Sequence, residues 1–72
     1  NQKMKITSLK SGIYFMVASN THADEFFDCH ESANNEIDYR KKMYPDCPVK
    51  LESAYVDGDN SQVLDSKLIV QV

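Results

Sequence analysis

Two different strand patterns occupy the start of the chain. From Lys3 to Leu9, the apolar residues Met4 and Ile6 alternate with charged or polar ones, which predicts a strand with one solvated face. The segment from Ile13 to Ala18 is continuously apolar, as is typical of a central strand that is buried on both faces. Gly12 lies between the two segments and favours a turn, because glycine tolerates backbone conformations that other residues avoid.

A helical pattern follows the second strand. Thr21 precedes Asp24 by three residues, which resembles a capping box at the start of a helix. Residues placed about 100° apart then form one continuous stripe, so we expect a single long helix from Thr21 to Met43. Pro45 ends it, because proline cannot continue a helix. The expected stripe consists of Ala23, Phe26, His30, Ala33, Ile37, Lys41 and Tyr44, with Phe27 and Cys29 on its flanks.

Two further strands complete the expected fold. Apolar and polar residues alternate from Val49 to Val56, and the turn-forming segment Asp57–Asn60 follows. The chain then returns as a strand from Val63 to Val72, with a polar interruption near Asp65 that predicts a β-bulge. The order strand, strand, helix, strand, strand predicts an α+β two-layer sandwich. In it, a four-stranded antiparallel sheet carries one long helix on one face.

The size and net charge of the chain limit the classes of function that we expect. A chain of 72 residues is expected to form one small soluble domain, residues 1–72. Its net charge of −3 differs from the basic field of most nucleic-acid-binding proteins, so a nucleic-acid partner is less favoured. No apolar run approaches the roughly 18 residues of a membrane span, so no membrane association is expected. Cys29 and Cys47 are too few for a disulfide scaffold, and we expect a reducing, cytoplasmic location.

Reactive residues do not form a recognisable catalytic or metal-binding pattern. Cys29 and His30 are adjacent, so on a helix their side chains diverge by about 100° and are expected to pack rather than react. Neither cysteine has zinc-site spacing, and the turn beginning at Asp57 lacks the glycine and glutamate of a calcium loop. A Cys29–Cys47 disulfide cannot close if the helix is continuous. We therefore expect a protein that is not an enzyme and needs no cofactor or metal.

One pair on the polar side of the expected helix suggests an interface. Tyr39 and Met43 are four residues apart, so they are neighbours on a helix, and both residue types are enriched at protein interfaces. With Glu36, Arg40 and Lys42 they form the candidate partner-binding surface. The leading hypothesis is a non-enzymatic protein-interaction module, such as an inhibitor or adaptor.

The expected sheet offers a second way to bind a protein. An edge strand can pair with a partner or with a second copy of the chain. The expected edges are Lys3–Leu9 and Lys67–Val72.

The alternative hypothesis is a nucleic-acid-binding module. If the fold brings two groups of basic residues together, they would bind the phosphates of the nucleic acid. The same residues are also expected if they only interact with solvent and compensate the helix dipole. The two groups are Lys3, Lys5 and Lys10, and Arg40, Lys41 and Lys42.

Overall fold

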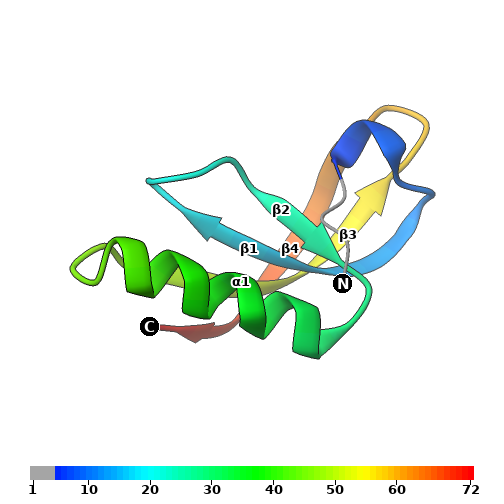
Figure 1. Cartoon of the computed structure of the whole chain (residues 1–72). Helices are drawn as coiled ribbons and strands as arrows, with labels where there is room; N and C mark the ends of the chain where they lie inside the picture. The colour runs from blue at the N-terminus through cyan, green and yellow to red at the C-terminus, as the bar shows by residue number, and fades with distance from the viewer. Residues whose placement is uncertain (1–4) are drawn as a thin grey trace.

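The computed structural model describes residues 5–72, which form a helix packed on one face of an antiparallel sheet (Figure 1). The strands lie in the order β2-β1-β3-β4, and this confirms the expected α+β architecture. In chain order the elements are η1 (Ile6–Ser8), β1 (Gly12–Ser19), β2 (Glu25–Phe27), α1 (His30–Met43), β3 (Val49–Asp57) and β4 (Gln62–Gln71).

The expected edge strand at Lys3–Leu9 is wrong for the residues that the structure describes. Ile6–Ser8 form the short 3-10 helix η1, in which the N–H of Leu9 donates to the carbonyl of Ile6. Leu9 is buried and Ile6 partly buried against an apolar cluster that includes Met16. The turn of η1 places Ile6 and Leu9 over this cluster. An extended edge strand would leave the cluster exposed to solvent. Lys3 and Met4 lie outside the described residues.

The first part of the expected helix is a strand instead. Glu25–Phe27 pair antiparallel with β1 as strand β2, and α1 begins only at His30. Phe26 and Phe27 are both buried, but in different apolar clusters. Because side chains alternate across a strand, these two neighbours reach opposite faces of the sheet. A helix continuing through this segment would bury one stripe only.

The sheet carries an apolar cluster on each face. Towards α1, Ala33 and Ile37 of the helix pack with strand residues from β1, β2 and β3. The members on the sheet are Val17, Phe27, Val49 and Leu51. The opposite face holds Leu9, Met16, Phe26, Ala54 and Val56, with Ile6 and Tyr14 packed against them. The central strand β1 serves both clusters, as its continuous apolar sequence predicts.

The predicted turn after β3 is confirmed and is pinned to the N-terminal segment. Asp57 accepts hydrogen bonds at Oδ1 from the N–H groups of Asp59 and Asn60, and the N–H of Gly58 donates to Ser11 Oγ. A Cβ atom on residue 58 would lie 2.5 Å from the carbonyl oxygen of Leu9. This close approach of two backbones explains the glycine.

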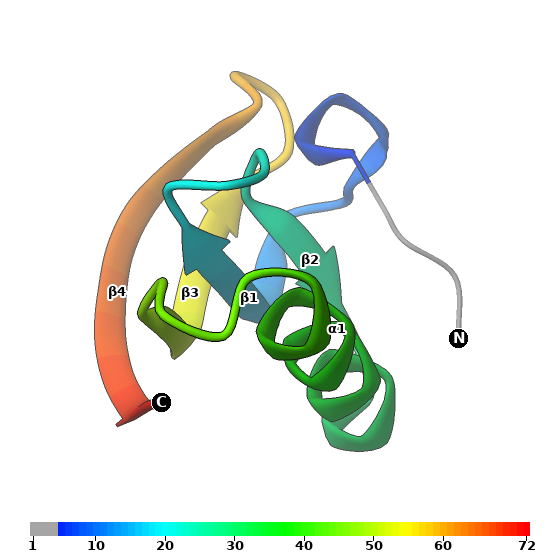
Figure 2. The same ribbon diagram turned by 60° about the vertical axis from the view of Figure 1, so that its left-hand side comes forward.

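Strand β4 is an edge strand with two irregularities. Consecutive pairs with β3 skip one β4 residue twice, which leaves Leu64 and Ile69 as the extra residues. The bulge expected near Asp65 is therefore confirmed at Leu64. Bulges increase the local twist of a strand, and β4 curves strongly along its length (Figure 2).

Candidate functional site

The most unusual surface of the protein is strand β4. Every residue of β4 is exposed, although the strand is rich in aliphatic side chains. The exposed aliphatic residues are Val63, Leu64, Leu68, Ile69, Val70 and the adjoining Val72, with relative exposures between 36% and 59%. These residues form two aliphatic groups, one on each side of Asp65, Ser66 and Lys67. Large exposed apolar surfaces typically mark an interaction site.

The backbone of β4 is also available. One side of the strand pairs with β3, and within residues 5–72 no strand pairs with its other side. An edge of this kind presents unpaired N–H and carbonyl groups to solvent. Helix α1 packs against β1, β2 and β3, so the helix does not shield this edge. The opposite edge of the sheet is β2, which has only three residues.

The expected helix surface is only partly present. Tyr39 and Met43 are 47% and 53% exposed, and Lys42 is exposed beside them. Glu36 and Arg40, in contrast, are buried, so their assignment to a partner-binding surface is wrong. The helix begins at His30 and turns the side carrying these two residues towards β1 and β2.

Arg40 instead joins the helix to the sheet. Its guanidinium is fully buried and donates to Glu36 Oε2 at 2.8 Å and to Glu25 Oε1 at 2.9 Å. It also donates to Ser19 Oγ at 2.9 Å and to the carbonyl oxygen of Ala23 at 2.8 Å. Buried charges require this kind of complete pairing, because desolvation costs several kcal/mol per ion. Arg40 therefore has a structural role.

Three rings gather next to this network. The ring centroid of His22 lies 5.9 Å from that of Tyr39 and 5.8 Å from that of Tyr44, in both cases edge-on. Nδ1 of His22 is 2.8 Å from the hydroxyl oxygen of Thr21. Tyr39 thus also orders the loop between β1 and β2.

The two basic groups do not form a continuous cationic surface. Arg40 is buried, and Lys41 donates a hydrogen bond from Nζ to the carbonyl of Cys47. Lys5 and Lys10 are exposed on either side of η1, which lies away from the C-terminal end of α1 (Figure 1), and Lys3 lies outside the described residues.

Cys29 and His30 are surface residues, so the expectation that they pack within the helix face is wrong. Both are exposed at the start of α1, where the ring of His30 lies 5.1 Å from that of Phe15.

Cys29 is the N-cap residue, without a side-chain capping hydrogen bond. The backbone N–H of Ser32, and after it that of Glu31, favours the thiolate and lowers the pKa of Cys29. Cys29 and Cys47 are both free thiols.

Alkylation should distinguish these two cysteines. The thiolate is the nucleophile, and an ordinary thiol has a pKa of about 8.5. A lowered pKa therefore increases the thiolate fraction of Cys29 at pH values below about 8.5. Cys29 is also exposed, whereas Cys47 is half-buried. We expect iodoacetamide near neutral pH to modify Cys29 several times faster than Cys47, as measured by mass spectrometry of peptides. Urea should abolish the difference, and equal rates in the folded protein would contradict the assignment.

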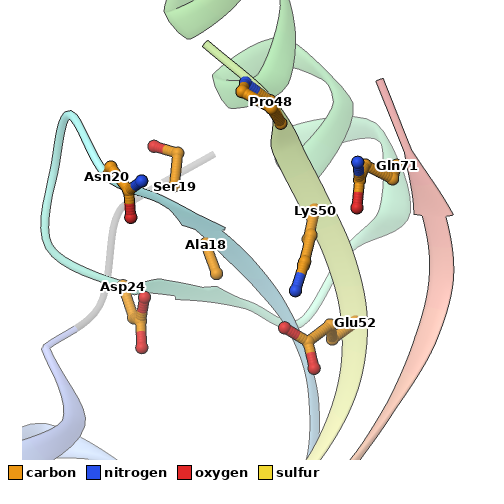
Figure 3. A pocket seen from close by; sticks show the side chains of 8 residues that line it. All are labelled: Ala18, Ser19, Asn20, Asp24, Pro48, Lys50, Glu52 and Gln71. Atoms are coloured by element: carbon orange, nitrogen blue, oxygen red, sulfur yellow. The ribbon is translucent and has the colours of Figure 1, made fainter.

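A pocket of about 430 Å³ opens between the ends of β1 and β3 (Figure 3). Asp24, Lys50 and Glu52 point into it, so its lining presents both signs of charge. The other lining residues are Ala18, Ser19, Asn20, Pro48 and Gln71. Among residues 5–72, the pocket included, no group of three or more His, Cys, Asp or Glu side chains is arranged to hold a metal ion.

Comparisons with known proteins add no relative. No protein-family model, curated protein or solved structure matches this chain. In the described part of the chain, no helix has the length and apolar character needed to cross a membrane.

Proposed function

We propose that this protein is a non-enzymatic protein-interaction module, an inhibitor or adaptor, that binds its partner through strand β4. The observation that carries the proposal is the ten-residue edge strand whose side chains are all exposed. A partner strand added to this edge would satisfy the unpaired backbone groups of β4 and cover its aliphatic side chains. Main-chain hydrogen bonds supply affinity in such complexes, and alternate side chains supply specificity.

Other features favour this edge over the helix surface. Of the five residues first assigned to the helix surface, Glu36 and Arg40 are buried in an ion-pair network. Tyr39 and Met43 remain exposed, but the ring of Tyr39 already contacts His22. Two free cysteines are consistent with a reducing compartment, so the proposal includes a cytoplasmic location.

Selection from a random decapeptide library tests this proposal. Peptides that bind the protein are expected to protect the backbone amides of β4 from hydrogen exchange. Leu68→Lys places a charge on the exposed edge and should lower the affinity of the protein for these peptides at least about tenfold. The matched change Met43→Lys on α1 should leave this affinity unchanged. Peptides that protect α1 from hydrogen exchange and bind the Met43→Lys variant less tightly would show that the partner binds the helix surface instead. A library that yields no β4 binder would overturn it.

Nucleic-acid binding remains the alternative proposal and is less favoured, because Arg40 is buried and the net charge is −3. Its test is a titration with single- and double-stranded oligonucleotides at low salt. Phosphate contacts would give an affinity that falls steeply as salt rises. Binding of that kind, weakened by Lys42→Ala and unaffected by Leu68→Lys, would favour this alternative over the β4 edge.

A further inference from the structure

The middle of β4 is polar and is flanked on both sides by aliphatic residues. The segment reads Val-Leu-Asp-Ser-Lys-Leu-Ile from Val63 to Ile69, so it is nearly symmetric about Ser66, with opposite charges on either side. Asp65 pairs with Tyr55 of β3 and Lys67 with Ser53, which places both charged side chains on one face of the sheet. Within residues 5–72, neither charge has an ion-pair partner.

We infer that β4 pairs antiparallel with β4 of a second copy of this chain, with the two Ser66 residues facing each other across the two-fold axis. This inference rests on the proposed use of the β4 edge and identifies the partner. The product is a symmetric dimer in which two four-stranded sheets join into one continuous sheet. Closed two-fold symmetry is the commonest arrangement of homo-oligomers.

The geometry of antiparallel pairing limits the choice of register. Side chains directly opposite each other lie on the same face of a sheet. A two-fold axis perpendicular to the sheet keeps the faces of both copies aligned. It must therefore pass midway between a residue and the same residue of the second copy, which lies directly opposite. A residue before this centre then lies opposite the equivalent residue after it in the second copy.

The charges of Asp65 and Lys67 distinguish the possible centres of the pairing. An axis at Asp65 or at Lys67 would place two like charges directly opposite each other, which is destabilising. An axis at Ser66 places Asp65 of each copy opposite Lys67 of the other, so two ion pairs form. The same register brings Leu68 of each copy towards the aliphatic residues Val63 and Leu64 of the other. Each charge thus gains its counterion and aliphatic residues meet across the axis.

The rest of the fold leaves room for this arrangement. Helix α1 packs on β1, β2 and β3, so neither helix blocks the β4 edge. Figure 2 shows β4 at the side of the sheet away from the helix. Between the extra residues Leu64 and Ile69, the pairing of β4 with β3 is regular. The centre of the proposed pairing therefore lies in an undistorted part of the strand.

Charge reversal tests both the partner and the register. By sedimentation equilibrium from micromolar to millimolar protein, Asp65→Lys alone or Lys67→Asp alone should raise the dimer dissociation constant about tenfold, because two ion pairs become repulsive. The exchange Asp65→Lys/Lys67→Asp should restore wild-type dimerisation. A mixture of the two single variants should form the heterodimer. The control changes Asp38→Lys and Lys42→Asp, on the exposed side of α1, should leave dimerisation unchanged.

Cross-linking tests the register independently of affinity. In a background with Cys29→Ser and Cys47→Ser, Ser66→Cys should form an intermolecular disulfide under mild oxidation, because facing Cα atoms in a sheet lie about 4.5–5.5 Å apart. Leu68→Cys is the control. Its two copies would be offset by about 13–14 Å along the strands, too far to bridge.

The outcomes separate this inference from the proposed function. A chain that stays monomeric at millimolar concentration, or an exchange variant that fails to restore the dimer, overturns self-pairing. If selected peptides still protect β4 in that case, the proposed function stands with a different partner. Efficient cross-linking through Leu68→Cys rather than Ser66→Cys would overturn the register.

Discussion

Replacing Arg40 with alanine is expected to remove most of the protein's free energy of unfolding. The change removes four hydrogen bonds, two of which form the ion pairs of Arg40 with Glu36 and Glu25. Removing one partner of a buried ion pair typically costs about 3–5 kcal/mol. Small domains are stable by only about 5–15 kcal/mol, and a chain of this size belongs near the lower end. Urea unfolding followed by circular dichroism measures the loss.

Two comparisons make the Arg40 result specific. Lys42→Ala removes an exposed cation of the same helix and should change the free energy of unfolding by less than about 0.5 kcal/mol. Arg40→Met combined with Glu36→Leu removes both buried charges and should recover part of the loss, because an apolar replacement leaves no unpaired ion between these two. Equal effects of Arg40→Ala and Lys42→Ala would show that the network does not hold the helix to the sheet.

Truncation of Phe26 and of Phe27 should each destabilise the protein by about 3–5 kcal/mol, the usual cost of removing a buried phenylalanine side chain. The reason is that β2 sends the two rings into separate clusters on opposite faces of the sheet. Denaturant unfolding of Phe26→Ala and Phe27→Ala measures both effects. Ile13→Ala is the control, because Ile13 is a strand residue that is 73% exposed.

This pair of variants also tests the assignment of β2. If the segment continued the helix, Phe26 would lie on its apolar stripe and Phe27 on the flank, so the costs would differ. A tolerated Phe27→Ala alongside a damaging Phe26→Ala would therefore contradict the strand.

Much of the sheet could be predicted because its patterns are dictated by burial. The continuous apolar run in β1 predicts a central strand, and the alternation in β3 predicts a strand next to it. The proline after Met43 fixes the end of α1, and Asp57-Gly58 fixes the following turn. In each case a local rule and the tertiary structure favour the same conformation.

The start of the helix could not be predicted because two local signals compete with tertiary packing. Thr21 and Asp24 resemble a helix start, and the helical spacing fits Phe26 as well as Ile37. Pairing with β1 decides otherwise, because only a strand buries both Phe26 and Phe27. The 3-10 helix at Ile6–Ser8 is likewise determined by the cluster it covers rather than by its own sequence.

The candidate site was only partly visible in the sequence for a related reason. Arg40 resembles its basic neighbours, and its spacing of four residues from Glu36 is equally typical of an exposed pair. Nothing local shows that Ser19 and the Ala23 carbonyl surround it. Lys67–Val72 was expected as a sheet edge, but nothing in its sequence shows that every residue of β4 is exposed.

The exposure of β4 also bears on how the molecule opens. Neither apolar cluster contains a residue of β4, so the strand is held mainly by its pairing with β3. Proteins open locally in units whose stability follows the apolar contacts they make. We therefore expect β4 to open at a lower free energy than global unfolding, which hydrogen exchange of its backbone amides would measure. Each such event uncovers the backbone of β3, so the outermost strand protects the rest of the sheet from unwanted pairing.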